Sequence, residues 1–268
     1  MEASQPWPID TADAIAQAPH LTIVDGSAHA ASLPLPRLAP QPVHLDRLRN
    51  QIEWDSFLPA HVLTRVGEFQ QGLKRFIDVV LAASLLTLLS PLFLLVAILV
   101  KLTSRGPIFY EFRVLGKRAR PFVAYKFRTM VENADALKPG LIKLNEMQGP
   151  AFKMRNDPRT TPLGRWLRKF SIDELPQLWS VLIGDMSLVG PRPPFADEFV
   201  QYKSWQWIRL AVTPGITCIW QVTGRSDIRD FDEWAALDAE YIKNWSLWLD
   251  LKILLKTIPA VLRGKGAY

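Results

Sequence analysis

A stretch without a charged side chain, residues 79–100, constrains this 268-residue chain more than any other feature. As a helix rising about 1.5 Å per residue, it is long enough to cross the hydrocarbon core of a bilayer. Its middle carries Ser90-Pro91, and proline removes a helix hydrogen bond and bends the helix. We therefore expect a membrane helix over residues 76–101 that is broken at Ser90 and Pro91.

Basic residues flank the apolar stretch on both sides, Lys74 and Arg75 before it and Lys101 and Arg105 after it. Because positive charge is favoured on the cytoplasmic side of a membrane, both ends are predicted to lie on that side. This favours a re-entrant helix, which enters one leaflet and returns. A straight transmembrane helix with a tolerated proline remains the alternative. Asp78, at the edge of the stretch, needs a partner, and Arg75 on the same helical face is the expected one.

Two adjacent carboxylates, Asp173 and Glu174, follow a run that contains Arg165, Arg168 and Lys169. Arginine binds polyanions with two-pronged hydrogen bonds, and a carboxylate can attack phosphorus or hold a metal ion. The pattern suits a phosphate-handling site, and the basic neighbours predict an ionised Asp173. A structural role is equally open, in which a helix begins near Asp173, uses it as a cap and favours Glu174 through its dipole.

The composition removes several kinds of chemistry from the region around Asp173. All four histidines lie before residue 62, and Cys218 is the one cysteine. This region therefore has no Ser-His or Cys-His pair and no histidine-bound metal, and no intrachain disulfide can form. Carboxylates, lysine, arginine or a hard cation with oxygen ligands remain. The net charge of +6 favours a polyanion or an anionic membrane as a partner.

The chain divides into three parts. Residues 1–45 carry seven of the 21 prolines and no sustained period, so we expect a disordered extension rich in proline and alanine. Residues 46–73 form a partly helical lead-in. Residues 74–268 form the main domain, helix-rich and of mixed α/β (α+β) class. Within it, 108–113 and 122–129 alternate like strands around a turn at 116–121, which predicts a basic β-hairpin.

The main domain also carries an ordered series of motifs: KRFID at 74–78, GPIF at 106–109, KFRTM at 126–130, DELPQ at 173–177, GDMSLVGPRP at 184–193, PGIT at 214–217 and WQVTGR at 220–225. With this series the chain resembles the bacterial sugar transferases, the monotopic polyprenyl-phosphate phosphoglycosyl transferases, and especially the exopolysaccharide-initiating type. The resemblance runs from about residue 74 to the end. Three residues depart from the family pattern: Cys218 replaces a glycine, Ser180 an asparagine and Thr213 a basic residue.

The resemblance implies a small catalytic domain carried by a re-entrant membrane helix on the cytoplasmic face of the bacterial inner membrane. It implies transfer of a sugar-1-phosphate from a UDP-sugar to undecaprenyl phosphate, with release of UMP. Asp173 is similar to the family nucleophile, which forms an acyl phosphate, and Glu174 is its dyad partner. Mg²⁺ is the implied cofactor, expected at the Asp173 carboxylate.

Five basic residues are implied in phosphate or substrate binding. Arg168, Arg192 and Arg225 match positions expected to clamp phosphate or hold the carboxylates, and Lys126 and Arg128 belong to a matching motif. The expected donor sugar is a hexose such as glucose or galactose, with an N-acetylated sugar as the alternative. The resemblance makes no prediction of the oligomeric state.

Two other functions are weighed against the transferase. A catalytically silent, membrane-anchored scaffold of a polysaccharide assembly complex is disfavoured by the intact Asp173-Glu174 pair. A basic nucleic-acid-binding protein is disfavoured by the long apolar stretch and by the lack of a nucleic-acid motif. We therefore expect a lipid bilayer, and no nucleic acid, among the partners.

Overall fold

The computed structural model describes residues 45, 49–223 and 228–264. The chain separates into two units, Met1–Arg37 and Leu38–Tyr268, and every described residue belongs to the second unit. The predicted disordered extension, residues 1–45, lies outside the described residues except for Leu45. Arg225 also lies outside them.

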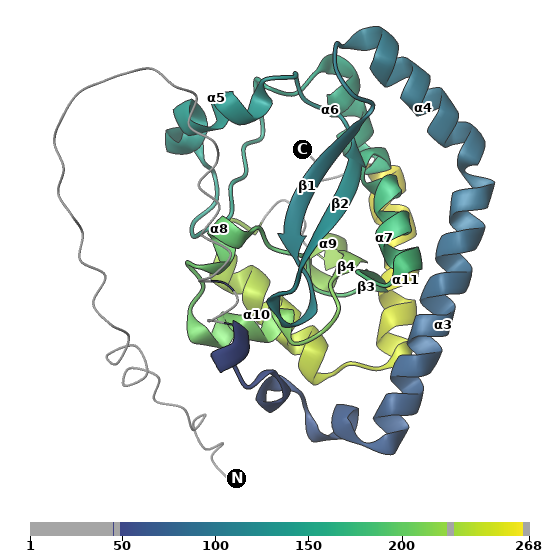
Figure 1. Ribbon diagram of the computed structural model, residues 1–268, viewed down its shortest axis with the longest axis vertical. Coiled ribbons are helices and arrows are strands. Elements are labelled where there is room, and N and C mark those ends of the chain that lie inside the picture. The colour runs from purple at the N-terminus through teal and green to yellow at the C-terminus, as the bar shows by residue number, and fades with distance from the viewer. Residues whose placement is uncertain (1–44, 46–48, 224–227, 265–268) are drawn as a thin grey trace, which may run out of the picture. The chain divides into compact units, whose positions relative to one another are not determined.

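Two consecutive helices, α3 (Arg65–Leu88) and α4 (Ser90–Thr103), contain the whole apolar stretch (Figure 1). They meet at an angle of 60°. Pro91 lies in the first turn of α4, where its missing N–H leaves no helix hydrogen bond unmade. The predicted break at Ser90 and Pro91 is therefore confirmed. Among the described residues no single helix has the length and apolar character of a membrane span, whereas this bent pair has both when its helices are taken together.

Strands β1 (Phe109–Leu115) and β2 (Pro121–Phe127) form the predicted antiparallel hairpin. Phe109 pairs with Phe127 and Leu115 with Pro121. The strands are displaced by one or two residues from the predicted ranges. A short 3-10 helix, Lys117–Ala119, forms the turn.

The rest of the described chain is mostly helical, in agreement with the expected helix-rich class, and holds one further pair of short parallel strands. These strands, β3 (Ser187–Val189) and β4 (Gly215–Thr217), pair through Ser187 with Gly215 and Val189 with Thr217. The α-helices are α5 (Ala134–Leu141), α6 (Pro162–Lys169), α7 (Leu178–Ile183), α8 (Ala196–Phe199), α9 (Ile219–Thr223), α10 (Phe231–Lys243) and α11 (Leu247–Arg263). The other 3-10 helices are η1 (Trp54–Phe57), η2 (Ala60–Leu63), η4 (Ile142–Leu144), η5 (Ile172–Gln177) and η6 (Ser204–Leu210).

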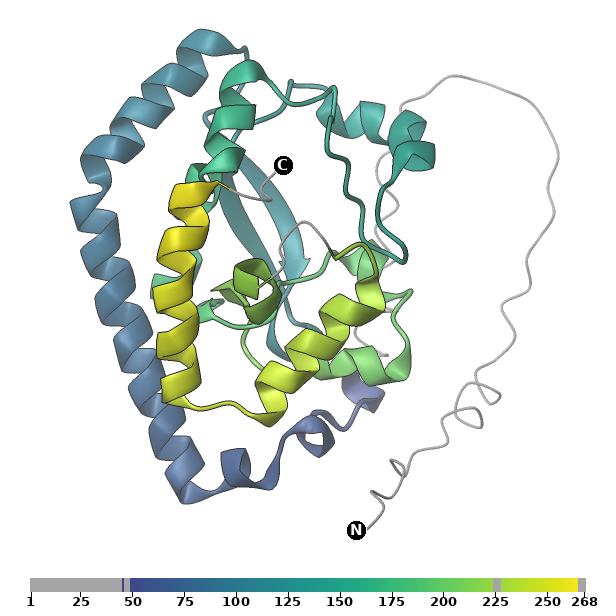
Figure 2. The same ribbon diagram turned by 180° about the vertical axis from the view of Figure 1, so that it is seen from behind.

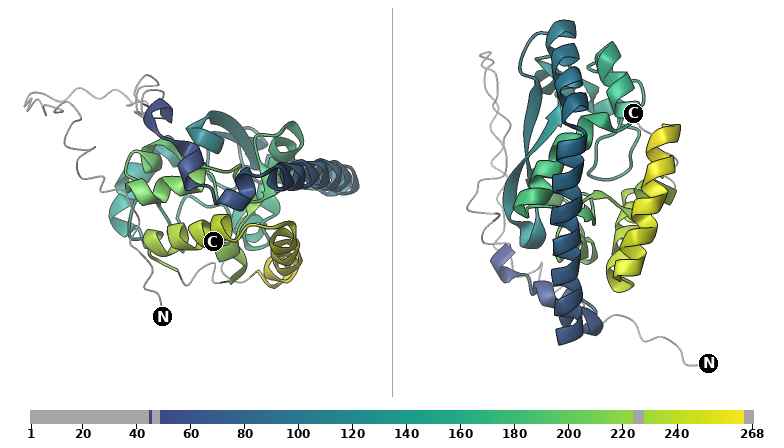
Figure 3. Two further views of the ribbon diagram at one scale, coloured as in Figure 1. Left: turned by 90° about the horizontal axis from the view of Figure 1, so that it is seen from below. Right: turned by 90° about the vertical axis from the view of Figure 1, so that its right-hand side faces the viewer.

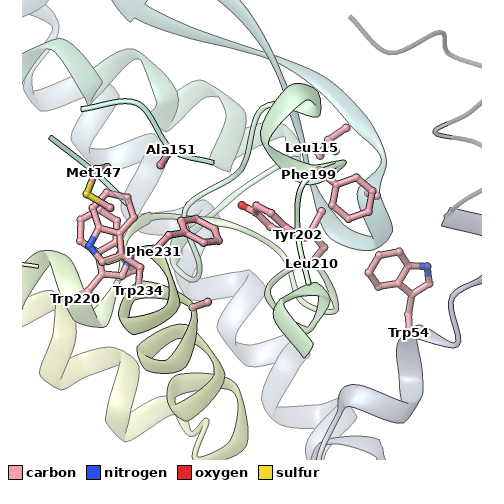
Figure 4. Packing of buried hydrophobic residues seen from close by; sticks show 13 residues of the cluster. Trp54, Leu115, Met147, Ala151, Phe199, Tyr202, Leu210, Trp220, Phe231 and Trp234 are labelled. Carbon is pink, nitrogen blue, oxygen red and sulfur yellow. The ribbon is translucent and has the colours of Figure 1, made fainter. Parts of the chain in front are cut away.

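Two large apolar clusters hold these elements together. The first is rich in aromatic side chains, and Figure 4 shows Trp220 and Trp234 stacked at one end and Trp54 at the other. Trp54 belongs to the lead-in before α3, so this part of the chain packs into the core of the main domain. The second cluster joins Ala82 of α3 to α7, β3, α10 and α11. Helix α11 accordingly runs beside α3 in Figures 2 and 3.

Polar contacts also attach α3 to the rest of the domain. Lys74 Nζ lies 2.6 Å from Asp250 Oδ2 of α11 and donates to the Val189 carbonyl at 2.9 Å. Asp78 accepts a hydrogen bond from the Leu188 N–H at 3.0 Å. Lys74 and Asp78 of α3 therefore bind backbone groups of β3, and Lys74 also binds a carboxylate of α11.

The predicted pairing of Arg75 with Asp78 is wrong. Arg75 donates instead to the carbonyls of Val181 and Leu182. These carbonyls lie in the last turn of α7, where carbonyl groups have no partner within the helix. The long guanidinium side chain reaches this helix end, while Asp78 finds a backbone N–H of its own.

Candidate active site

The 3-10 helix η5 carries both central carboxylates. The chain enters it through Ser171, which has a left-handed backbone conformation with a φ of 54°. Ser171, and not Asp173, occupies the position before the helix, so the predicted capping role of Asp173 is wrong. Asp173 lies in the first turn and is 6% exposed. The Asp173 carboxylate therefore does not cap this helix.

Among the described residues, two cations approach the same carboxylate oxygen of Glu174. Lys126 Nζ of β2 is 2.6 Å from Glu174 Oε1, and Arg192 Nη1 is 3.7 Å from the same oxygen. Lys126 and its cross-strand partner Tyr110 lie on the same face of the hairpin. Lys126 reaches Glu174 from that face. The structure therefore brings together residues that lie 48 positions apart in the sequence.

The charges around Asp173 oppose one another. Burial raises the pKa of the Asp173 carboxyl, and the neighbouring Glu174 carboxylate raises it further. Lys126, Arg168 and Arg192 act in the opposite direction without reversing the shift. A raised pKa does not by itself contradict an ionised Asp173, which stays a prediction; the sequence did not show how completely Asp173 is removed from water.

Arg168 approaches Asp173 from α6. Its Nε donates to Thr129 Oγ1 at 2.9 Å, and its Nη1 donates to Thr160 Oγ1 at 3.4 Å. Burial lowers the pKa of Arg168, while the charges of Asp173 and then Asp157 oppose that shift. Two threonine hydroxyls thus fix the guanidinium close to the carboxylates.

A buried ion pair that the sequence patterns did not reveal lies behind Arg168. Arg159 donates through Nη2 to Asp157 Oδ2 at 2.6 Å and through Nε to Asp157 Oδ1 at 2.9 Å. Both side chains are almost completely buried. Opposite charges two positions apart in a loop carry no distinctive signal, so this pair could be found only in the folded chain.

The structure places Arg128 differently from the other predicted phosphate-binding residues. Its Nη2 donates to the backbone and side-chain oxygens of Ser104, both at 2.8 Å. A Cβ at Gly106 would lie 2.3 Å from Arg128 Nη1, so this guanidinium fits because residue 106 is a glycine. Arg128 thereby fastens the end of α4 to the hairpin. Its binding of phosphate stays a prediction, as does that of Arg225.

A second buried ion pair joins Arg209 of η6 to Asp238 of α10, at 2.8 Å from Nε to Oδ2. These residues are 29 positions apart, and neither belongs to a motif that the sequence analysis singled out for chemistry. Arg209 also donates to the Arg192 carbonyl at 3.3 Å. It therefore connects the core to the loop that carries a predicted site residue.

The donor set at Asp173 and Glu174 fits Mg²⁺. Within the described part of the chain no group of three or more histidine, cysteine, aspartate or glutamate side chains gathers as for an all-protein metal site. Magnesium is typically bound by one or two carboxylates together with substrate phosphates and water. Asp173 accepts no hydrogen bond from the described residues, so its oxygens remain available as ligands.

Together these groups can act on a phosphate ester. A buried carboxylate, Asp173, lies among Lys126, Arg168 and Arg192, which offset the negative charge of an approaching phosphate. A carboxylate needs no base to act as a nucleophile. The described parts of the main domain contain no histidine, so the arrangement suits phosphoryl chemistry that is carried by carboxylates and cations.

Comparison with known proteins also indicates a protein that acts on sugar phosphates. Residues 69–264 match the model of the family described as bacterial sugar transferase. Among similar proteins, the exopolysaccharide production protein ExoY of Rhizobium meliloti is 44% identical over 199 residues, which cover 73% of this chain and 88% of that protein. The undecaprenyl-phosphate galactose phosphotransferase of Salmonella typhimurium is 43% identical over 201 residues, or 73% of this chain and 42% of that protein.

The galactosyl transferase CpsE of Streptococcus agalactiae is 50% identical over 162 residues, which cover 60% of this chain and 36% of that protein. This chain thus spans most of the Rhizobium protein but less than half of the other two relatives. The family match includes α3 from residue 69 onward, α4, the hairpin and every described residue of the candidate site. The chain is a member of the bacterial sugar transferase family.

Proposed function

We propose that this protein transfers a sugar-1-phosphate from a UDP-sugar to undecaprenyl phosphate, releases UMP, and so begins the membrane-bound assembly of an exopolysaccharide. The observation that carries the proposal is the cluster of Asp173, Glu174, Lys126, Arg168 and Arg192 in a chain of this family. Relatives named for exopolysaccharide production and for an undecaprenyl-phosphate phosphotransferase support this substrate class.

The proposed reaction has two steps. A carboxylate oxygen of Asp173 attacks the phosphorus that bears the sugar, the bond from that phosphorus to the UMP oxygen breaks, and an acyl phosphate forms. An oxygen of undecaprenyl phosphate then attacks the same phosphorus, and Asp173 leaves as a carboxylate. Lys126 and Arg192, which both lie near Glu174 Oε1, would offset phosphate charge in both steps.

Asp173 is also the residue that would hold Mg²⁺ together with the donor phosphates. When bound there, the ion supplies positive charge that neutralises the phosphoryl group during transfer. We expect the reaction to stop when the ion is removed with a chelator and to return when Mg²⁺ is added.

The bilayer is the second part of the proposal. The bent pair α3–α4 exposes large apolar side chains along its length, including Phe76, Leu88, Leu94 and Leu102. Many large apolar side chains exposed on one pair of helices are unfavourable in water and mark a surface for lipid or protein. We place the pair in the cytoplasmic leaflet of the bacterial inner membrane, with Lys74 and Lys101 on the cytoplasmic side.

The deciding experiment supplies purified protein with Mg²⁺ and one UDP-sugar at a time, starting with UDP-galactose and UDP-glucose, in the absence of lipid acceptor. We expect about one UMP per enzyme and a phosphosugar mass on the peptide that contains Asp173. Adding undecaprenyl phosphate should then give repeated turnover. Asp173→Asn should form neither product.

Other outcomes have clear meanings. Turnover with acceptor but no adduct and no acceptor-independent UMP would support direct transfer, with Asp173 acting as a metal ligand. No UMP from any hexose or N-acetylated donor, with acceptor and Mg²⁺ present, would overturn the proposed activity and favour the catalytically silent scaffold.

A further inference from the structure

The loop that carries Arg192 is held through its backbone carbonyls. Residues 191, 193 and 194 are prolines, which lack an N–H and have a fixed φ. The Pro191 carbonyl accepts from the Gly215 N–H, and the Pro194 carbonyl accepts from the Leu115 N–H, both at 2.9 Å. Strand β4 and the end of β1 thus hold the two sides of the loop.

Between these two points, the Arg192 carbonyl accepts a hydrogen bond from Arg209 Nη2 at 3.3 Å. This contact comes from a side chain in the core rather than from a neighbouring backbone. It acts on the residue whose own guanidinium lies 3.7 Å from Glu174. A shift of Arg209 would therefore be passed to the Arg192 side chain.

The guanidinium of Arg209 is fixed from several directions. Nε donates to Asp238 Oδ2 at 2.8 Å and Nη1 donates to Tyr202 Oη at 2.6 Å. The rings of Tyr202 and Phe231 lie 5.5 and 5.0 Å from the guanidinium carbon, within the range of cation–π attraction. Arg209 and Asp238 are 3% and 0% exposed, so Arg209 is held in a single orientation.

A buried ion pair is weak evidence for a gain in stability, because desolvation of both charges offsets their attraction. Apolar residues of similar volume often serve equally well in such a position. What apolar residues cannot provide is the hydrogen bond from this position to the Arg192 carbonyl. The geometry therefore calls for a role beyond core packing.

We propose that Arg209, held by Asp238, is a positioning residue that sets the Arg192 guanidinium beside Glu174 and Asp173. The role rests on the proposed function, since Arg192 belongs to the proposed phosphate site. Arg209 itself touches none of the reacting groups. Its effect on turnover is transmitted through the backbone of residue 192.

The test uses the double variant Arg209→Met with Asp238→Leu. It removes both charges together, so neither is left unpaired in the core. The matched control is Lys203→Met, because Lys203 pairs with Asp232 and so joins the same two segments, the start of η6 and α10, at the exposed surface. The control does not touch the Arg192 loop.

The first measurement is amide hydrogen exchange at Gly215 and Leu115, whose acceptors are carbonyls of the loop. It requires no activity. We expect exchange at these amides to be about tenfold faster in the double variant, because a loosened loop opens more often, and unchanged in Lys203→Met. Unchanged exchange in a folded double variant would show that Arg209 does not hold the loop.

The second measurement is a double-mutant cycle that combines the Arg209/Asp238 double variant with Arg192→Ala. The measured quantity is kcat/KM for the UDP-sugar. We expect the double variant to lose about tenfold or more, as small displacements of a positioning group do. In the Arg192→Ala background it should cause little further loss, because the effect passes through Arg192. An equal further loss in that background would overturn the proposal and assign the pair to the core alone.

If the double variant does not fold, Arg209→Lys takes its place. Lysine keeps the charge beside Asp238 but cannot reproduce three directed contacts. The same exchange and cycle results are expected from it, and wild-type values for both would overturn the proposal. If wild-type protein releases no UMP, the proposed function fails, while the exchange measurement still decides whether Arg209 holds the loop.

Discussion

Individual side chains of the candidate site have sharply different surroundings. Among the described residues, Lys126 at 2.6 Å and Arg192 at 3.7 Å lie within 4 Å of Glu174. Lys126 is mostly buried, whereas the Arg192 side chain is 42% exposed. Arg192 therefore has nitrogen atoms available for a ligand, and Lys126 is engaged with Glu174.

The exposure of Arg192 leads to a prediction for Arg192→Lys. Lysine retains the positive charge but loses the planar, two-pronged contact with phosphate. We expect KM for the UDP-sugar to rise about tenfold, equivalent to about 1.4 kcal/mol. Steady-state kinetics of UMP release measures it. Arg113→Lys is the control, because Arg113 is exposed and alternates to the other face of β1 from Tyr110, the cross-strand partner of Lys126. Unchanged kinetics for Arg192→Lys would remove Arg192 from the phosphate site.

The buried pair Asp157–Arg159 leads to a prediction of pH-dependent stability. Burial alone would raise the pKa of the Asp157 carboxyl, but the hydrogen bonds and charge of Arg159 outweigh it, and the pKa lies below its usual value of 3.8. The unfolded chain therefore binds the proton more readily. The pair's contribution is present above pH 3.8 and is lost as the pH falls through the lower, folded-state pKa.

We expect Asp157→Asn to lower stability at pH 7 by about 3 kcal/mol, because Arg159 loses its buried partner. The variant should also lose less stability than wild type between pH 5 and acid conditions. Thermal unfolding across pH measures both effects. Asp55→Asn is the control, since the pair of Asp55 with Arg118 is exposed on both sides and is expected to contribute little. Parallel pH profiles for wild type and Asp157→Asn would contradict the assignment.

At the scale of the elements, the two parallel strands β3 and β4 come unusually close. Gly190, just after β3, and Gly215 of β4 face each other without side chains. A Cβ at Gly215 would lie 2.0 Å from the Gly190 nitrogen and 2.6 Å from the Val189 carbonyl carbon. Since both atoms belong to the backbone, neither can move without displacing the Arg192 loop.

We therefore expect Gly215→Ala to destabilise the protein by about 3 kcal/mol and to lower the rate of UMP release. Gly72→Ala is the matched control. A Cβ at Gly72 of α3 would have no atom within 4 Å, so the substitution should stabilise the helix by about 0.5–1 kcal/mol. Thermal unfolding of both variants in the same detergent is the measurement. Equal stability of the two variants would contradict the close approach of the strands.

At the scale of the whole molecule, the bent pair and the main domain form one connected body within the unit Leu38–Tyr268. Helix α3 is attached by the Lys74–Asp250 ion pair, by Asp78 and by Ala82 in the second apolar cluster. The end of α4 is attached through Arg128. A proposed re-entrant insertion thereby sets the height of the candidate site above the bilayer.

The topology can be tested with single cysteines at Glu68 and Thr103, near the outer ends of α3 and α4. Both residues are exposed, whereas Lys74 is engaged in an ion pair. The natural Cys218 is buried, and burial raises the pKa of its thiol well above the usual value, so background labelling should be low. We expect both positions to be labelled from the cytoplasmic side only.

Labelling of the two positions from opposite sides would overturn the re-entrant topology. In a helix that ran straight through the break, the backbone N–H supplied by Pro91→Ala would bond to the carbonyl of Thr87, four residues earlier. We expect this variant to shift part of the population toward a straight span, with Thr103 accessible from the other side. Glu68 should keep its cytoplasmic labelling and serves as the internal control.

The N-terminal extension gives a further prediction at this scale. We expect a chain that begins at Leu38 to retain full turnover, because the first unit ends at Arg37 and every candidate site residue lies after it. Truncation to residue 46 would also remove Leu45, which packs against the first apolar cluster. Loss of turnover in a folded, membrane-bound chain from Leu38 would show that the extension takes part in the chemistry.

The sequence alone was sufficient for features that depend on local chemistry. The helix break at Ser90-Pro91 follows from the missing N–H of proline, and the hairpin follows from strand alternation around a turn. The carboxylates and several of their cations could be named from residue types and motifs. These inferences depend only on residues that are close together in the sequence, so they can be made without knowledge of the tertiary structure.

Tertiary structure alone decided which distant groups meet and how far water is excluded from them. Arg75 binds the end of α7 rather than Asp78, and Arg209 pairs with Asp238 across 29 positions. Burial raises the pKa of the Asp173 carboxyl despite the cations around it. Partner choice and desolvation depend on the packing of elements that are remote in the chain, and local sequence patterns carry no record of that packing.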